Sequence, residues 1–447
     1  MIFLTDLLIV VVCCLILLDF KRGFFIVVLA KLFTPVYVRF VLSSVSVDVF
    51  DLWTIIMIVS LIVHRLKLSS VKKFPFFKLF LLYSAVLIVL AFFATRMSLG
   101  SQLYYIIKQN LFQEMLICYF AYLVFIEKQY AGRFINYMAI VCIVCGFYGI
   151  LVYLMQKNVY IDSLSRAFVG EKNIYADFLS DARMGLKGRS SGTLPHPLSW
   201  AQYWCVIVSF VYLIKNNLKK NLYFILLFLG LTNIVLSGSR AALLSLCPLL
   251  YLYYRRADLS KKFICVMALL VAVVAILGYS NKGESLLNIA RSLIVDTSGR
   301  AATGSSSTMR LSQFENMMNI LKGKDFLFGY GSGFLASESN LRESLTLEMR
   351  GFESVIFQKV FDLGVIGCLA FFAFFKRLFD SMKVQCGSNG LSLAMFFLSY
   401  MIAILITGVQ GGSFSFFLVF SFACVFFLQK YEEKNIENKN VKVGERI

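Results

Sequence analysis

The residues of this chain that could do chemistry are a few arginines and one glutamate in or beside its polar segments. Arg189 and His196 lie in the stretch GRSSGTLPHP, just before a helix start expected at Pro197. Helix amino ends carry partial positive charge and free N–H groups, so this stretch can hold a phosphate. The alternatives are that the prolines only stiffen the loop and that His196 sits at the wet interface.

Another arginine, Arg240, lies in the turn SGSR between two apolar segments. The rest of the turn consists of small residues, so Arg240 can point a fixed cation toward a cavity between the two helices. The alternative is an interfacial anchor whose side chain only reaches water. We favour the functional interpretation, in which Arg240 faces an anionic group.

The long polar segment 280–354 contains three further candidates. Arg310 lies in the first turn of a helix expected from Thr308, where a cation is unfavourable to the helix dipole. This placement suggests an anionic partner, with a solvated arginine as the alternative. Arg350 and Glu353 stand at the end of the segment, immediately before the next apolar run.

The same segment has two features of local structure. Apolar residues recur at steps of three and four, which predicts an amphipathic helix on the membrane surface or across the bundle; they are Leu311, Phe314, Met318 and Leu321. The glycine-rich stretch FGYGSGF, at 328–334, lets the backbone turn sharply and approach a ligand closely. It is not a nucleotide loop, because no GK[ST] follows it. In the next run, Gly364 and Gly367 favour close helix packing.

Apolar runs near membrane-spanning length must position these residues. Hydrophobic residues make up 59% of the chain and charged residues 15%, whereas soluble domains are roughly 45–50% apolar. We therefore expect an all-α polytopic membrane protein with about 13 transmembrane helices. The expected spans are 2–18, 24–42, 49–64, 76–95, 103–125, 134–156, 198–214, 222–236, 241–254, 263–278, 355–375, 391–409 and 414–428. The second is interrupted by Lys31, Pro35 and Arg39, so it is either a bent span or a re-entrant segment.

The distribution of charge predicts the topology. The net charge of +19 comes from basic clusters between apolar runs, as the positive-inside rule describes, so nucleic acid is not an expected partner. The amino terminus is then outside and the tail 429–447 cytoplasmic. Two large loops, 157–197 and 280–354, share the outer side.

Of the 11 cysteines only Cys386 lies outside an apolar run, in a cytoplasmic loop, so we expect no disulfide in either outer loop.

The order and spacing of these motifs resemble the O-antigen polymerase and O-antigen ligase superfamily. The resemblance covers roughly 189–367 and rests on the GTLPHP helix entry, the SGSR turn, the R-x3-F helix, FGYGSG and LGVIG. It implies a glycosyltransferase C-like fold acting on undecaprenyl-diphosphate-linked glycans at the periplasmic face of the bacterial inner membrane, with no cofactor and no metal. Ligases of this group usually have His where this chain has Glu353, which favours a polymerase.

The implied chemistry fits the residue types. In transfer from a lipid diphosphate the leaving group is the diphosphate, and arginines can stabilise its developing charge through bidentate hydrogen bonds. The attacking hydroxyl must lose a proton, which a carboxylate can accept. We therefore expect diphosphate binding by Arg189, Arg240, Arg310 and Arg350, and Glu353 as the base of an inverting transfer. The alternative for Glu353 is a simple ion pair with Arg350.

Three activities remain open. A polymerase joins lipid-linked repeat units into O-antigen, capsule or exopolysaccharide; a ligase moves a finished chain to another acceptor; a flippase moves its substrate without bond chemistry. No paired inverted halves are evident in the sequence, which counts against a transporter. The expected partners are the lipid-linked donor and acceptor glycans and membrane lipid, with a chain-length regulator as a further candidate.

Charged residues inside the expected spans are a separate matter. Lys31, Lys108 and Glu114 lie within apolar runs, where such residues usually face a cavity or each other. Asn110 and Glu114, four residues apart, share one helix face. These residues can line a glycan passage or only stabilise the bundle, and we assign them no catalytic role.

Overall fold

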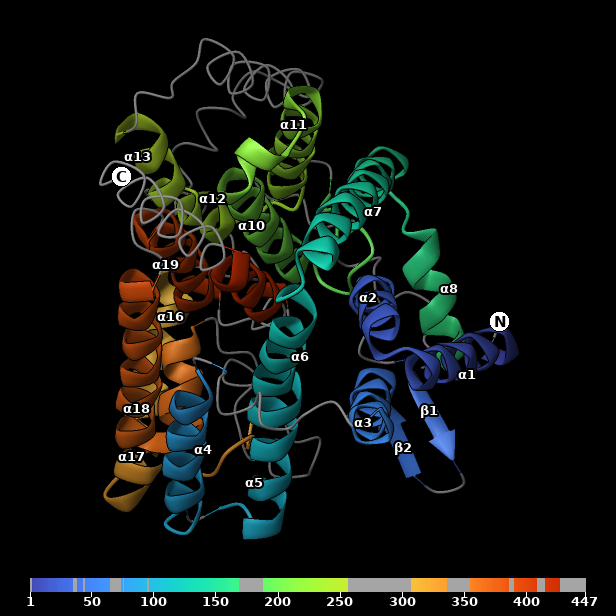
Figure 1. The fold of residues 1–447 in the computed structure, drawn as a ribbon. Coiled ribbons are helices and arrows are strands. Elements are labelled where there is room, and N and C mark those ends of the chain that lie inside the picture. Colours follow the sequence, from blue (N-terminus) through green and yellow to red (C-terminus); the bar gives the residue numbers. More distant parts are fainter. Residues whose placement is uncertain are drawn as a thin grey trace, which may run out of the picture.

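The computed structural model describes residues 2–34, 38–42, 45–64, 74, 76–94, 96–168, 188–255, 307–335, 354–385, 390–407 and 415–426. Within these residues the chain is almost entirely helical (Figure 1). The amino-terminal helices are α1 (Ile2–Leu18), α2 (Phe20–Lys31), α3 (Val49–Val63), α4 (Phe77–Ala91), α5 (Leu99–Ile106), a π-helix (Ile107–Met115), α6 (Leu116–Phe125), α7 (Lys128–Met155) and α8 (Val159–Phe168). The others are α10 (Pro197–Leu213), α11 (Lys220–Leu236), α12 (Arg240–Ser245), α13 (Cys247–Arg255), α16 (Ser307–Ile320), α17 (Lys324–Phe328), α18 (Val355–Gln385), α19 (Gly390–Thr407) and a helix over Ser415–Phe426.

Several of these helices have the composition of membrane spans. By length and composition, α7 and α18 can each cross a membrane, and shorter apolar helices of 10–17 residues accompany them. Large apolar side chains remain exposed along α1, α4 and α7, as expected where lipid rather than water surrounds the protein. The helical architecture agrees with the expected fold class. The expected span 263–278 lies outside the described residues, and the total number of spans stays a prediction.

The second expected span, 24–42, is wrong. Helix α2 begins earlier, where Asp19 accepts hydrogen bonds from the backbone N–H groups of Lys21 and Arg22, and it ends at Lys31. The chain then forms an antiparallel hairpin of β1 (Arg39–Leu42) and β2 (Val45–Asp48). Hydropathy cannot separate a short strand rich in β-branched and aromatic residues from the second half of a span.

Contacts at one end of the bundle join segments that the sequence places in the cytoplasm. The Lys21 ammonium, at the start of α2, pairs with the Glu127 carboxylate just before α7. The His64 ring, after α3, hydrogen-bonds the carbonyl of Leu17 in the last turn of α1 at 2.8 Å. These ends therefore share one side, as the charge distribution predicts.

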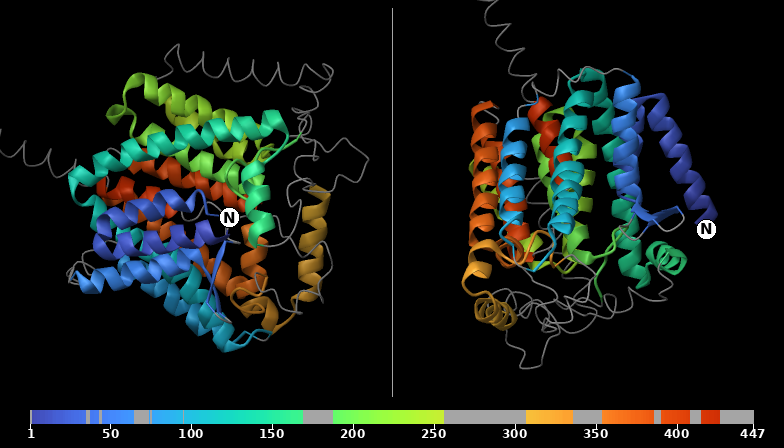
Figure 2. Two further views of the ribbon diagram at one scale, coloured as in Figure 1. Left: turned by 90° about the vertical axis from the view of Figure 1, so that its right-hand side faces the viewer. Right: turned by 90° about the horizontal axis from the view of Figure 1, so that it is seen from below.

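Contacts at the opposite end join segments expected outside. The backbone N–H of Arg96 donates to the Tyr330 carbonyl at 3.3 Å, and the Tyr160 hydroxyl on α8 contacts the carbonyl of Phe33 beyond α2. Figure 2 shows the amino terminus, the hairpin, α8 and α16 together at this end. The segments expected in the cytoplasm thus lie at one end of the bundle and those expected outside lie at the other, in agreement with the expected topology. Which end faces the cytoplasm stays a prediction.

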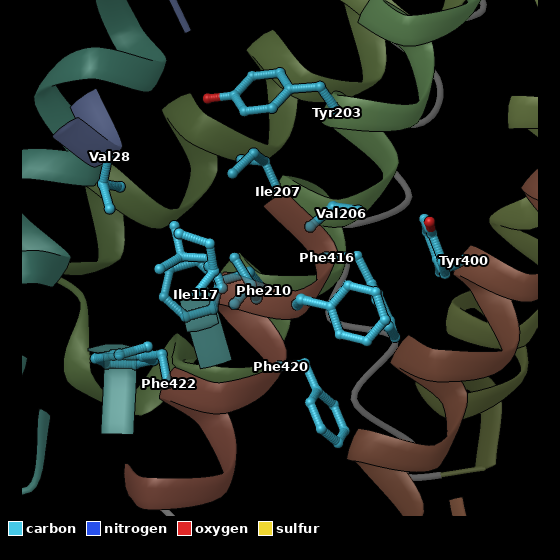
Figure 3. Close-up of a cluster of buried hydrophobic side chains, with 14 of the residues drawn as sticks. Val28, Ile117, Tyr203, Val206, Ile207, Phe210, Tyr400, Phe416, Phe420 and Phe422 are labelled. Carbon is cyan, nitrogen blue, oxygen red and sulfur yellow. The ribbon is translucent and has the colours of Figure 1, made fainter. Parts of the chain in front are cut away.

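The core of the bundle is aromatic (Figure 3). Phe416 stacks on Tyr400 with ring centroids 3.9 Å apart, and Phe422 packs against Phe125 and Phe134 at 4.9 and 5.0 Å. Such pairs contribute roughly 0.5–1.5 kcal/mol each beyond the area they bury. The contacts tie Ser415–Phe426 and α19 to α6 and α7, and so fix the carboxyl-terminal helices among the amino-terminal ones.

The Lys21–Glu127 pair makes stability depend on pH. The hydrogen bond from Lys21 lowers the pKa of Glu127 below its ordinary value of 4.5. A carboxylate with a lowered pKa stabilises the fold above its unfolded-state pKa and loses that contribution as the pH falls through the folded-state pKa. Because both side chains are partly exposed, we expect E127Q to lower the Tm only slightly at about pH 7 and not at all by about pH 3.

The measurement is thermal unfolding of the purified protein across this pH range. E315Q, on the exposed face of α16, is the matched control and should not change the Tm at any pH. A deficit of E127Q that persists at about pH 3 would contradict the assignment.

Candidate functional site

The structure brings Arg189 and the SGSR turn together. The Nε of Arg189 donates to the carbonyl of Ser237 at 2.9 Å, across 48 residues of sequence, and the next N–H, of Ser190, donates to the Leu236 carbonyl at 2.9 Å. Gly238 has φ +64°, and a Cβ there would lie 3.3 Å from the Arg189 side chain. Arg189 is 3% exposed. Its guanidinium is therefore held against the turn that leads into Arg240.

The side chains of Asn158, just before α8, and of Trp200, on α10, fix the loop that carries Arg189. The Asn158 amide donates to Ser191 Oγ at 3.0 Å and to the Gly192 carbonyl at 2.8 Å. Gly192 has φ +53°, and a Cβ there would lie 2.3 Å from the Trp200 ring. Only glycine fits both this conformation and this space. The loop is thus seated on rigid helices, as a precise binding site requires.

A buried asparagine supports the same region from within the bundle. Asn233 on α11 accepts a hydrogen bond from Trp200 Nε1 at 3.2 Å and donates to the carbonyls of Gly146 on α7 and Leu229 at 3.0 and 2.8 Å. It therefore joins α7, α10 and α11. The sequence-based reasoning missed it, although an asparagine within an apolar run is itself a signal of a buried polar contact.

His196 and Arg240 lie at helix starts. Nδ1 of His196 accepts a hydrogen bond from the backbone N–H of Leu198 at 3.1 Å, so His196 caps α10 and carries its neutral-ring proton on Nε2. Arg240 is the first residue of α12, which Ser239 caps by accepting from the Ala242 N–H at 3.3 Å. Both helix starts follow from a capping side chain that accepts a backbone hydrogen bond, His196 for α10 and Ser239 for α12.

The helix predicted to carry Arg310 is confirmed as α16, which begins at Ser307. Among the described side chains of α16, Gln313 and Met317 are buried, as is Leu321 just after the helix, whereas Phe314 and Met318 are 43% and 39% exposed. The buried face is therefore rotated from the expected one, because α16 packs its Gln313 face inward. Phe314 still reaches α18, with its ring centroid 6.0 Å from that of Phe357.

Arg350 and Glu353 lie outside the described residues, but the residue after Glu353 is placed. Ser354 Oγ donates to the Leu405 carbonyl near the end of α19 at 2.8 Å. Helix α19 packs against both α18 and α12. The start of α18 and the helix that begins with Arg240 therefore flank the same element.

The glycine-rich segment 328–334 docks on a break in α18. Gly364 interrupts that helix with φ +68°. The Phe361 carbonyl accepts a hydrogen bond from the backbone N–H of Tyr330 at 3.0 Å. The Asp362 carbonyl accepts one from the backbone N–H of Gly331 at 2.9 Å. A Cβ on Gly329 would lie 2.5 Å from the Asp362 backbone. In the described residues, the close approach that these glycines permit is to α18.

Arg96, in the α4–α5 connection, and Gln102, on α5, hold the other side of this turn. Oε1 of Gln102 accepts from the Ser332 N–H at 3.2 Å. The Arg96 guanidinium lies 5.3 Å from the Tyr330 ring centroid. Burial raises the pKa of Tyr330, and Arg96 acts to lower it, so the phenol stays protonated near neutral pH. Arg96 was missed at the sequence level because a short loop gives no hint of its distant partner.

Comparison with known proteins finds a family match in the central part of the chain. The family model described as O-Antigen ligase matches residues 225–372, which contain the SGSR turn, α16, the glycine-rich turn and the break in α18. The match confirms the resemblance to the O-antigen ligase and polymerase superfamily. The chain matches none of the curated proteins. Among the described residues, no three His, Cys, Asp or Glu side chains are grouped to hold a metal ion.

The break in α18 makes a specific prediction. A Cβ on Gly364 would lie 2.2 Å from the Leu327 carbonyl oxygen, at a positive φ that other residues adopt only under strain. We expect G364A to destabilise the protein by about 1–3 kcal/mol. G132A on α7, where a Cβ meets nothing within 4 Å, is the control and should be neutral or slightly stabilising. Thermal unfolding measures both, and equal Tm values would refute the role of Gly364.

Proposed function

We propose that this protein, whose residues 225–372 match the O-Antigen ligase family model, polymerises lipid-linked oligosaccharide repeat units into a surface polysaccharide. The donor is an undecaprenyl-diphosphate-linked glycan, and the reaction is an inverting glycosyl transfer at the periplasmic face of the inner membrane. The observation that carries the proposal is the Arg189–Ser237 hydrogen bond, which joins two arginine-bearing segments at one place.

The arginines serve the leaving group. As the bond between the anomeric carbon and the phosphate oxygen breaks, its electron pair passes to the diphosphate, whose negative charge increases. Arginine presents a rigid fork of N–H donors that matches phosphate oxygens. The Ser237 carbonyl holds Arg189 in one orientation before substrate arrives, so little reorganisation is needed during reaction. Arg240, which follows the same turn, contributes the second cation.

The other half of the site comes from α16 and the start of α18. Arg310 stands one helical turn before Phe314 and so shares its face, and Phe314 contacts Phe357 in the first turns of α18. In the proposed site, Arg310 acts together with Arg350 and Glu353. In the proposed reaction, Glu353 takes the proton of the acceptor hydroxyl while its oxygen attacks the anomeric carbon from the face opposite the diphosphate.

The ligase activity is the second candidate. Polymerase and ligase share the arginine-bearing motifs, and both release undecaprenyl diphosphate. The presence of Glu353 where ligases of this group usually have histidine favours the polymerase. The remaining partner of a polymerase would be a protein that sets chain length.

We expect R240A and E353Q to abolish polymer formation while the protein still inserts in the membrane. Loss of a general base lowers rates by about 100-fold to 10,000-fold, and loss of an arginine that stabilises the leaving group has a similar effect. Polymer is measured with purified protein and lipid-linked repeat units. R166A on α8 and E315Q on α16 remove exposed side chains of the same types and should retain activity. Full activity of R240A and E353Q would refute the assignment.

Deletion of the chain from its host separates the two activities. A polymerase mutant should show a single repeat unit on the acceptor, because attachment continues without elongation. A ligase mutant should show no attached repeat at all. Gel analysis of the surface glycan reads out the difference, and a ladder of normal length would exclude both activities.

A further inference from the structure

A group of polar side chains lies inside the bundle and has no role in the reaction above. It consists of Tyr83 on α4, Tyr105 on α5, Glu114 in the π-helix, Lys359 on α18 and Tyr400 on α19, and we call it the Glu114 cluster. The Glu114 carboxylate interacts electrostatically with Lys359 and with all three tyrosines. Ionisable residues at membrane depth are costly, and they commonly mark a substrate path.

Two of the tyrosines are deeply buried without a partner for their hydroxyl groups. Tyr83 is 7% and Tyr400 3% exposed, and their rings stack on Phe374 and Phe416 with centroids 4.7 and 3.9 Å apart. In the described part of the chain neither hydroxyl makes a hydrogen bond. Buried polar groups nearly always have a partner, so these hydroxyls point to a ligand or water.

The charged members of the cluster also keep their hydrogen-bonding capacity. Over the described ranges, Glu114 accepts no hydrogen bond and forms no direct ion pair with Lys359. By contrast, Lys108 in the same π-helix pairs directly with Asp51 on α3 at 2.9 Å. The Glu114 and Lys359 side chains are only partly buried, so part of each borders accessible space.

The cluster adjoins the glycine-rich turn. A Cβ on Gly333 would lie 2.3 Å from the Tyr105 ring, so the turn rests directly on this tyrosine. Tyr105 also interacts electrostatically with Asp362, whose Oδ1 accepts from the Leu335 N–H at 3.1 Å. The Glu114 cluster thus lies next to the glycine-rich turn that follows α17.

We propose that the Glu114 cluster binds a sugar ring of the glycan, as a subsite separate from the diphosphate site. The inference rests on the proposed function. The cluster supplies hydrogen-bond donors and acceptors for neighbouring sugar hydroxyls, from its three tyrosine hydroxyls, the Glu114 carboxylate and the Lys359 ammonium. The charges of Glu114 and Lys359 balance, which suits a polyhydroxylated ligand, whereas a diphosphate would be repelled by Glu114.

The test measures two ligands on the full-length protein in nanodiscs. The first probe is the oligosaccharide repeat unit released by mild acid from the host polysaccharide, and the second is undecaprenyl diphosphate. Y83F and Y400F should each weaken oligosaccharide binding about threefold to tenfold, the loss expected for one hydrogen bond, and E114Q about tenfold or more. None of the three should change undecaprenyl diphosphate binding.

Thermal unfolding distinguishes a binding role from a structural one. Because the hydroxyls lack protein partners, Y83F and Y400F should leave the Tm unchanged or raise it. The matched control is Y212F, which removes the hydroxyl of a buried tyrosine on α10, beside Lys215, and should leave oligosaccharide binding unchanged.

Three results would overturn the inference. The first is that the wild type shows no saturable oligosaccharide binding. The second is that the cluster variants bind the oligosaccharide as tightly as Y212F does. The third is that the cluster variants have a lowered Tm and lose the oligosaccharide and undecaprenyl diphosphate equally. R240A keeps the two proposals apart, because it should lose undecaprenyl diphosphate and retain the oligosaccharide. If R240A binds undecaprenyl diphosphate normally, the diphosphate site fails while the sugar subsite stands.

Discussion

The carbonyl groups that end α11 need partners, and the loop containing Arg189 provides them. The last carbonyls of any helix lack intrahelical donors, and where they are buried water cannot replace them. Here Leu236 accepts from the backbone of Ser190 and Ser237 from the side chain of Arg189. A cation at a helix carboxyl end is also electrostatically favourable. The same bond that completes the helix therefore fixes the arginine beside the turn that carries Arg240.

The break in α18 solves the same problem with a different segment. Gly364 leaves the helical conformation, and the carbonyls of Phe361 and Asp362 accept from the backbone of the glycine-rich turn. Irregular backbone in a membrane protein is tolerated where other protein groups satisfy it. In both places a polar segment is bound to the bundle through unsatisfied carbonyls. Helix interruptions thus determine where the candidate site is assembled.

The sequence predicted those parts of the structure that local pattern encodes. Apolar runs located α4, α7, α10 and α11, and the turn residues located the start of α10 and the SGSR turn. The hairpin after α2 was missed, because an apolar strand and half a span have the same hydropathy. Partners such as Gln102 and Ser332, 230 residues apart, could not be found, since no local pattern encodes them. The roles of Arg350 and Glu353 remain predictions from the motif.

The π-helix constrains the length of the chain as well as its composition. Its nine residues carry Lys108, which faces Asp51 on α3, and Glu114, which interacts with Lys359 on α18. A π turn holds more residues than an α turn. Inserting or deleting one residue between Lys108 and Glu114 would change the angle between their side chains by up to about 100°. The two charges could then no longer face their separate partners, so this stretch should tolerate substitutions better than insertions or deletions.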